Sequence, residues 1–363
     1  MLLAAAQLAC EFVAVRVLMF RLARRLRIAA AIPVSFAFYT VLCGTADAHV
    51  KWFCAYNVAG QPDGLENVLC LDFEFLTGLS ILALMTGSLL EGTPVGMAIL
   101  HALDRATALI RNNLETIFRA SVAFFFIAIW GLGGVLLTPE LKTNSTLIGA
   151  IQLGIAAGMV SRRTMPLSAL GIFTLYAVAT WNYGIFHLAD YPVFLGVAAY
   201  LALTGLQKNF FGARPIDVLR WAAGITLMWA SIEKWAYPEW SYPLFIAKPE
   251  MSMGFTPDFF MRAAGAVEFA LAFALIWTPL VRRVGAAMLA AMFVSAVFEF
   301  GKIDLIGHTL IVVALFGILA DDGGRQARLR DSWILPLSYA AALALFLAVY
   351  YVGHAELFGT AIL

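Results

Sequence analysis

The chain has 363 residues, of which 62% are hydrophobic and 13% are charged, and its formal net charge at pH 7 is +1. Soluble domains carry about 25% charged residues, and the deficit extends along the whole chain. The composition therefore excludes a soluble enzyme with one membrane anchor and predicts an all-α, multi-pass protein of the lipid bilayer. The small net charge argues against nucleic acid as a partner, because that function needs a basic face.

The first 48 residues resemble a secretory signal peptide. Four arginines between residues 21 and 27 precede an apolar run at 28–43, and Ala46-Asp47-Ala48 follows as a small-x-small cleavage sequence. Residues 1–18 fit such a signal poorly, which makes Met19 a candidate start. The alternative is an uncleaved first transmembrane helix.

Cleavage after Ala48 would leave His49 as the first residue. A terminal amine and an imidazole on one residue can chelate copper, so His49 is a candidate metal ligand; signal cleavage before an ordinary histidine is the alternative. Cys54 and Cys70 follow in the same outer segment. An oxidising compartment permits a disulfide between them, and two free thiols are equally compatible with the sequence.

Ten further segments are candidates for membrane spans, each of which needs about 20 mostly apolar residues. Two of them are short and could be tilted, merged or re-entrant. Arginine and lysine concentrate in alternate loops, among them the pairs Arg162-Arg163 and Arg282-Arg283. This pattern predicts a bacterial inner-membrane protein with those loops in the cytoplasm and the mature N-terminus in the periplasm. The segments are 73–90, 119–137, 146–160, 165–183, 189–206, 217–235, 259–281, 285–300, 304–320 and 334–353.

Residues 97–119 form a different kind of segment, with apolar residues at helical spacing opposite charged ones. This pattern predicts an amphipathic helix on the inner leaflet, or a cytoplasmic extension of the next span. It completes a region at 49–118 that also contains a periplasmic start and the first of the ten spans.

Two later regions, 119–206 and 214–325, resemble each other as four-helix units in parallel orientation, with 326–363 left as an inner loop and last span. Chance similarity between helices rich in Ala and Leu is the alternative. The second unit gains an outer insertion at 241–262 that resembles a lid. The matching positions are Arg119 and Arg220, Gly149 to Gln152 and Gly265 to Glu268, the two arginine pairs, and Tyr183-Gly184 and Phe300-Gly301.

The second unit is similar to the DoxX/DoxD-like four-helix membrane proteins. The similarity rests on Arg220, Glu233-Lys234, Gly265-x-x-Glu268 and Arg282-Arg283. It covers about 105 residues. Some members of that family are linked to thiosulfate:quinone oxidoreduction and others to sulfur or oxidative-stress redox complexes. The resemblance implies a membrane module that works with quinone or with a periplasmic or membrane redox partner.

The ionisable residues of the second unit gather toward the predicted outer side. A charge in hydrocarbon costs roughly 2.5–3.5 kcal/mol on insertion scales, so such residues usually face a partner or a wet cavity. Asp304 and His308 are four residues apart and share a helix face. The cluster consists of Glu233, Lys234, Glu268, Glu299, Lys302, Asp304 and His308.

Three interpretations of this cluster stay open. A quinone site would use Glu268 and His308 as proton donor and acceptor, with Trp229 and Trp235 around the ring. A transporter of a small solute or ion, copper included, would use the carboxylates as binding groups at the repeat interface. A non-catalytic scaffold would use ion pairs to hold helix ends together, for example Lys234 with Glu233 or Glu268, and Glu299 with Lys302. The chain contains no G-x-S-x-G, Walker A or H-E-x-x-H motif.

Overall fold

The computed structural model describes residues 50–324 and 328–362, and in these residues the chain is all helical, with two isolated β-bridges and no β-strand. The predicted signal peptide at 1–48 and the candidate copper ligand His49 lie outside the described residues. The α-helices are α2 (Val50–Phe53), α3 (Leu65–Val68), α4 (Leu71–Glu91), α5 (Pro94–Asn112), α6 (Leu114–Leu132), α7 (Thr146–Gly158), α8 (Met165–Tyr183), α9 (Ile185–Leu188), α10 (Pro192–Leu206), α11 (Pro215–Ala236), α12 (Tyr242–Ala247), α13 (Pro257–Ala274), α14 (Pro279–Phe300), α15 (Lys302–Ala320) and α16 (Leu329–Phe358). Three short 3₁₀ helices are η1 (Arg162–Thr164), η2 (Pro238–Ser241) and η3 (Pro249–Ser252).

Each of the ten predicted spans overlaps one helix: α4, α6, α7, α8, α10, α11, α13, α14, α15 and α16. Among the described residues, six helices are long and apolar enough to cross a membrane, namely α4, α6, α8 with its preceding turn, α14, α15 and α16. Helices α7 and α10 are apolar but shorter. A multi-pass membrane protein follows from these six helices, whereas the count of ten spans stays a prediction.

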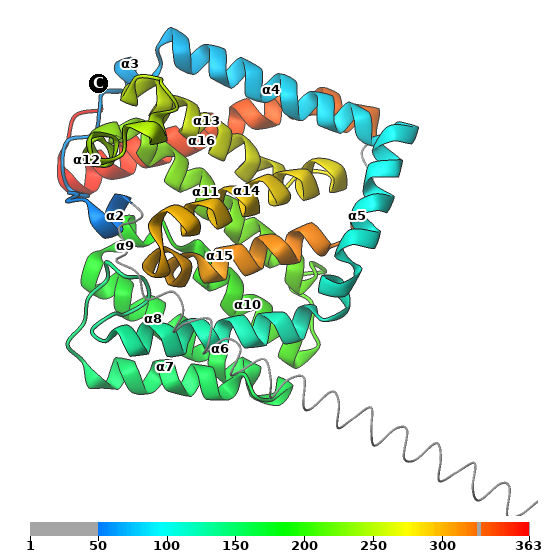
Figure 1. Cartoon of the computed structure of the whole chain (residues 1–363), viewed down its shortest axis with the longest axis vertical. Helices are drawn as coiled ribbons and strands as arrows, with labels where there is room; N and C mark the ends of the chain where they lie inside the picture. The colour runs from blue at the N-terminus through cyan, green and yellow to red at the C-terminus, as the bar shows by residue number, and fades with distance from the viewer. Residues whose placement is uncertain (1–49, 325–327, 363) are drawn as a thin grey trace, which may run out of the picture. The chain divides into compact units, whose positions relative to one another are not determined.

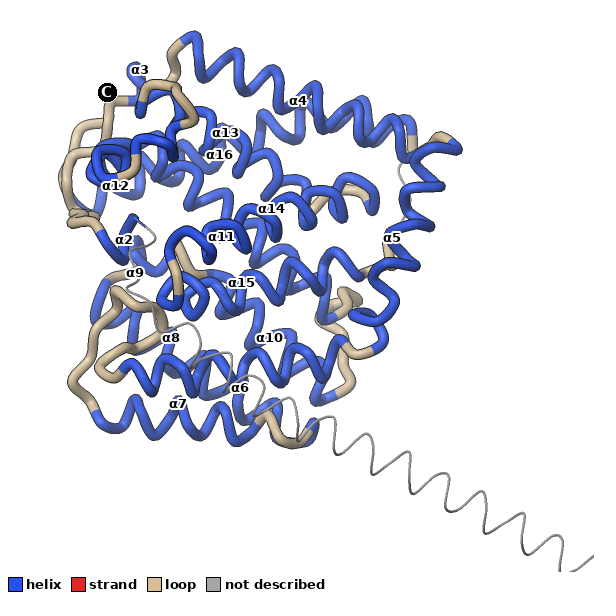
Figure 2. The backbone as a smooth tube through the Cα atoms, in the orientation of Figure 1, coloured by secondary structure: helices blue, strands red, loops and turns tan. Residues whose placement is uncertain are grey.

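The helices follow one another around the bundle in the order α6, α7, α8, α10, α11, α13, α14, α15, and α15 packs back against α6 (Figures 1 and 2). Helices α4 and α16 pack against each other, and α4 also covers α13. Two ends of this bundle are named below by the elements that lie there. The α2 end carries α2, α9 and α12, and the α5 end carries α5.

Helix α5 contains most of the predicted amphipathic segment, whose last residues belong to α6 because the helix is interrupted at Asn113. It connects α4 to α6 and crosses the ends of α14 and α15 (Figure 1). The Thr93 hydroxyl caps its first turn by accepting a hydrogen bond from the amide of Gly96 at 3.2 Å. A helix that lies across the ends of spanning helices is placed as an interfacial helix would be.

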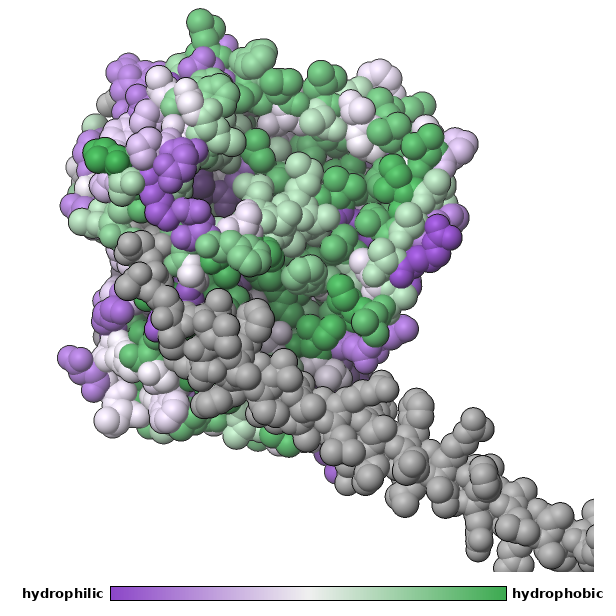
Figure 3. Space-filling view, viewed as in Figure 1, coloured by the Kyte–Doolittle hydropathy of each residue, from purple (hydrophilic) through white to green (hydrophobic). Residues whose placement is uncertain are grey.

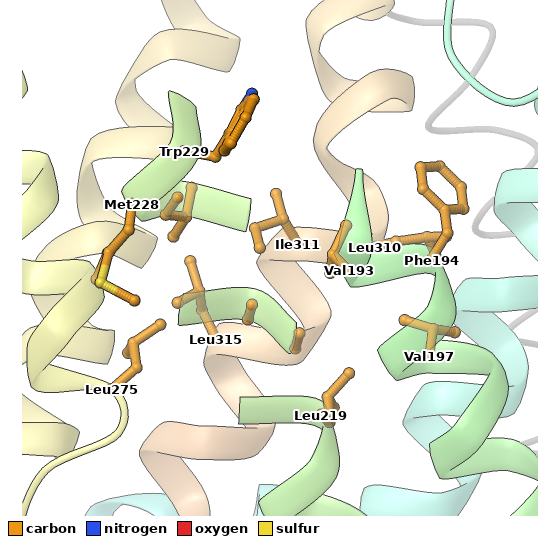
Figure 4. Packing of buried hydrophobic residues seen from close by; sticks show 14 of the residues in the cluster. Val193, Phe194, Val197, Leu219, Met228, Trp229, Leu275, Leu310, Ile311 and Leu315 are labelled. Carbon is orange, nitrogen blue, oxygen red and sulfur yellow. The ribbon is translucent and has the colours of Figure 1, made fainter. Parts of the chain in front are cut away.

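The core lies where α10, α11 and α15 meet (Figure 4). Phe194 and Val197 of α10, Trp229 of α11 and Leu310 and Leu315 of α15 are all buried there. Lipid could cover the apolar surfaces of these helices equally well, so the hydrophobic effect does not hold them together. Their packing depends instead on how closely the side chains fit.

Small residues allow the closest helix contacts. A Cβ atom added to Gly196 would lie 2.3 Å from Cβ of Ala222, where α10 meets α11. One added to Gly285 would lie 2.8 Å from Cβ of Ala274, where α13 meets α14. The neighbouring backbones approach too closely for any larger side chain, as is typical of membrane helices.

The surface between the two ends is apolar. Figure 3 shows hydrophilic residues near α3 and α12 and again along α5, with hydrophobic residues between them. Phe75 and Leu82 of α4 are 65% and 62% exposed, and Trp181 of α8 is 90% exposed. An exposed apolar band of this extent is what a bilayer covers.

The arginine pair Arg282-Arg283 corrects one boundary. The sequence placed both residues in a loop, but α13 ends at Ala274, Pro279 begins α14, and each arginine is only 1% exposed. Proline favours the first helical turn, so this residue marks the true start. The guanidinium of Arg283 donates to the backbone oxygen of Leu319 at 2.8 Å, which satisfies a carbonyl at the end of α15.

Candidate functional site

Lys51 on α2 lies between two carboxylates from distant parts of the chain. Its Nζ donates to Asp190 and, at 2.6 Å, to Oε1 of Glu233. Lys51 is 7% exposed and Asp190 6%, and the Glu233 side chain is 11% exposed. These three residues are called the Lys51 centre below. They join the segment after the predicted cleavage site to both predicted repeats.

Local chain geometry brings the two carboxylates together at the α2 end. Gly184 ends α8 with φ +87°, a conformation that favours glycine, and the chain turns directly into the four-residue α9. Pro192 then begins α10, so Asp190 lies just before a helix N-terminus. Glu233 lies in the last turn of α11, where its backbone oxygen accepts from Tyr237 at 2.8 Å.

Two aromatic rings complete the surroundings of the ammonium group. Nζ of Lys51 lies 5.9 Å from the ring centroid of Tyr56 and 5.6 Å from that of Trp240. Burial alone would lower the pKa of Lys51, but attraction to Asp190 and Glu233 outweighs it and raises this pKa above its usual value. Lys51 is therefore a cation at neutral pH.

A second set of polar groups adjoins the centre. Burial, with a smaller contribution from Lys51, lowers the pKa of His187 to about 4, so its ring is neutral. Among the described residues, His187 Nε2 and Asp190 Oδ1 have no hydrogen-bond partner although both are buried. The Tyr191 hydroxyl donates to Glu140, whose pKa burial raises. The rings of Tyr56, Tyr183 and Tyr191 surround His187 at centroid distances of 5.8, 5.7 and 6.3 Å.

Asp304 and His308 form a second pair on α15, as their spacing predicted, with His308 Nδ1 3.1 Å from an Asp304 oxygen. The ring of Trp52 on α2 lies 4.8 Å from the His308 ring and directly against Gly307, where an added Cβ would be 2.0 Å from the indole. On its other side His308 meets Phe293 at 4.7 Å. Helix α2 is thus held at two places, by Lys51 and by Trp52.

Glu268 pairs with Lys234, as one interpretation expected. Next to this pair, the Trp235 indole donates to the backbone oxygen of Arg262 at 3.1 Å. A cavity of about 460 Å³ opens here, between the predicted lid and the segment around α3. It is lined mainly by polar residues: Asp63, Glu66, Asn67, Val68, Cys70, Lys234, Trp235, Pro238, Tyr242, Asp258 and Arg262.

The four residues expected around a quinone occupy three separate surroundings. Trp229 packs against Phe186 and Tyr350 at 5.2 and 4.9 Å, away from the Trp52 contact of His308. Trp235 lines the polar cavity, beside the pair that holds Glu268. Their role in binding quinone stays a prediction.

One expected ion pair was wrong, and of the two alternatives expected for Lys234 the structure contains the pair with Glu268. Glu299 pairs with Lys248 of the lid rather than with Lys302. Glu233 pairs with Lys51 rather than with its neighbour Lys234, because successive helix residues point in different directions. Cys54 and Cys70 are both free thiols in the structure.

The sequence did not single out Lys51, Asp190 or His187 as site residues. Lys51 and Asp190 lie in segments read as outer loops, where a charge is ordinary. A usable signal existed for Lys51, because two aromatic residues follow it directly in Lys51-Trp52-Phe53, and such neighbours favour an ordered segment over a solvated loop.

The comparisons with known proteins add no further identification: no family model, no curated protein and no solved structure matches the chain. The described residues also contain no group of three or more His, Cys, Asp or Glu side chains placed to hold a metal ion. The site is therefore interpreted from its own chemistry.

Proposed function

We propose that this protein is a multi-pass protein of the bacterial inner membrane that holds and exchanges a proton at the Lys51 centre, as the membrane subunit of a quinone-linked redox system. The α2 end would face the periplasm. The observation that carries the proposal is the excess of buried carboxyl groups over buried cations around Lys51. Quinone and a redox partner enter through the DoxX/DoxD-like resemblance of the second repeat.

The carboxyl excess implies a bound proton. One ammonium group, that of Lys51, serves Asp190 and Glu233, and the buried Glu140 adjoins them through Tyr191. Neighbouring carboxylates in a site of low dielectric constant cannot all ionise, because an uncompensated buried charge costs several kcal/mol. We therefore expect the centre to retain a proton at neutral pH, shared among its carboxyl groups.

Contacts that recur in both predicted repeats support the duplication. In each, a glycine of the second helix packs against a tryptophan of the first, and the polar residue three positions later contacts the chain in the last turn of the first helix or just after it. Equivalent arginines also bind carbonyls in the last turn of the fourth helix or just after it. The pairs are Gly149 with Trp130 and Gly265 with Trp235, Gln152 with the carbonyl of Val135 and Glu268 with Lys234, and Arg162 with the carbonyl of Thr204 and Arg282 with that of Gly323.

The copies differ where proton chemistry would occur. Gln152 cannot ionise, whereas Glu268 at the matching position can, and the Leu136-Leu137 pair of the first copy has no charge. The second repeat therefore supplies Glu233, and the first supplies Asp190 from the loop before its last helix. A centre shared between two related units favours the outer junction of the repeats as the working part of the molecule.

Infrared titration of the purified protein tests the bound proton. We expect the carbonyl band of a protonated carboxyl group at neutral pH, and a weaker band in Glu140→Gln and in Glu233→Gln. Glu250→Gln is the matched control, because Glu250 is exposed at the same end. A wild-type protein without the band at neutral pH would exclude the proton-holding centre.

Quinone is tested separately by extracting the lipids that stay with the detergent-purified protein. We expect bound quinone in the wild type and reduced retention in Asp190→Asn and Glu268→Gln. Infrared evidence for the proton without any retained quinone would leave proton exchange standing and remove the quinone link.

Transport of a small ion is the second candidate, and one observation favours it. The Lys51 centre lies between α10 and α11, the last helix of the first predicted repeat and the first helix of the second. Transporters built from repeats place their binding groups at such an interface. Proton or sodium flux into liposomes that contain the wild type, abolished by Asp190→Asn, would favour transport over a redox role.

A further inference from the structure

The groups around Lys51 have the composition of a receptor for an organic ammonium ion. Two carboxylates, Asp190 and Glu233, accept hydrogen bonds from the ammonium group, and the faces of Tyr56 and Trp240 flank it. Carboxylates combined with aromatic faces are the usual means by which proteins bind ammonium groups. Asp190, Glu233 and Trp240 come from segments far from α2 in the sequence, and Tyr56 lies in the loop that follows α2, so most of the receptor is built by other segments while its occupant comes from α2.

We infer that these groups form a recognition site for primary ammonium ions and that Lys51 occupies it as a tethered ligand. A free amine would enter when α2 leaves. The inference goes beyond proton exchange, and it can fail while proton exchange holds, because it is tested by the binding of amines.

The chemistry of the site selects this class of ligand. Two carboxylates repel anions, and the described residues hold no cluster suited to a metal ion. Asp190 Oδ1 is buried without a partner among the described residues, which leaves an acceptor for a further N–H group. A primary ammonium group has three N–H donors and no acceptor, so it matches a site made of acceptors.

Helix α2 is suited to leave the site. Its described part, Val50–Phe53, has four residues, and a helix of this length has little stability of its own. Its position depends on the ion pairs of Lys51 and on the contact of Trp52 with Gly307 and His308. An amine at high concentration would compete with the first of these two attachments.

Rescue of a shortened side chain tests the site directly. Lys51→Ala removes the equivalent of propylammonium, so we expect n-propylammonium chloride to restore at least half of the lost melting temperature in a saturable manner. Tetramethylammonium chloride at equal ionic strength has no N–H donor and should not do so. Lys234→Ala is the matched control, because Lys234 pairs with Glu268 but has no aromatic ring within cation–π distance among the described contacts. Equal responses to both salts, or in both variants, would overturn the inference.

The wild-type protein gives a second measurement that does not depend on how the variant folds. Cys54 directly follows α2 and is half-buried as a free thiol. We expect n-propylammonium to accelerate maleimide labelling of Cys54, located by peptide mass mapping, and to leave labelling of Cys70 unchanged. No acceleration, or the same acceleration with tetramethylammonium, would contradict the tethered-ligand arrangement.

Discussion

Replacement of Lys51 by methionine tests how strongly the Lys51 centre stabilises the fold. Methionine keeps much of the side-chain length and removes the charge, so Asp190 and Glu233 lose their shared cation while they stay buried. Breaking a buried ion pair by removing one partner costs about 3–5 kcal/mol. Loss of the ammonium from the rings of Tyr56 and Trp240 adds roughly 0.5–1 kcal/mol. We expect the variant to be less stable by about 3.5–6 kcal/mol at neutral pH.

The loss should depend on pH, and its sign follows from linkage. In the variant, a buried carboxyl group without a cation binds a proton more readily in the folded state than in the unfolded chain. Stability then falls as pH rises, because the folded state must give up that proton. The difference between Lys51→Met and wild type should therefore be small in acid and grow toward neutral pH.

Thermal unfolding in detergent, followed by intrinsic tryptophan fluorescence over a series of pH values, measures this difference. Lys142→Met is the matched control, because Lys142 is exposed and a surface substitution of this kind usually changes stability by less than about 0.5 kcal/mol. A Lys51→Met protein that unfolds like the control, or whose deficit does not change with pH, would refute the electrostatic account of the centre.

Three further predictions use other parts of the structure. The pKa of His187 lies near 4 in the folded protein instead of near 6.5, so protonation of the unfolded chain should destabilise the protein as pH falls through this window, by up to about 3 kcal/mol. In His187→Gln this part of the pH dependence of the melting temperature should disappear. Gly307→Ala should displace the indole packed on it and increase maleimide labelling of the thiol after α2, whereas Gly131→Ala, with open space around its Cα, should label like wild type. Arg283→Met should leave a backbone carbonyl unpaired and lower stability by about 1–3 kcal/mol, whereas the exposed Arg163→Met should have little effect in the same unfolding assay.

The helices could be predicted from the sequence because membrane spans are a local property. Such a span is a run of consecutive apolar residues about as long as the bilayer is thick, which the sequence shows directly. Each predicted run overlaps a helix. The boundary near Arg282 was misplaced for the same reason. Hydropathy alone predicts a loop at an arginine pair. It does not show that carbonyls in the last turn of α15 and just after it accept hydrogen bonds from the two guanidinium groups.

The charged site could be predicted only in part. Glu233, Glu268 and His308 were recognised because an ionisable residue within an apolar run is unusual. Lys51 lies outside the long apolar runs and Asp190 at the very start of one, where a charge is not unusual, and 139 positions separate them. Their contact depends on how α2 packs against α15 and on the turn before α10, which only the tertiary structure provides.

The infrared band of protonated carboxyl groups in Lys51→Ala tests the proton-exchange and the ammonium proposals together. If the centre stores a proton because its carboxyl groups outnumber its cations, removing the Lys51 ammonium should increase the infrared band of protonated carboxyl groups. If the centre also recognises ammonium ions, n-propylammonium should reverse that increase in Lys51→Ala, while tetramethylammonium should not. An increase without reversal would mean that the site holds protons but does not recognise amines. Without any increase, Asp190 and Glu233 must find another cation or water when Lys51 is absent, and both proposals would fail together.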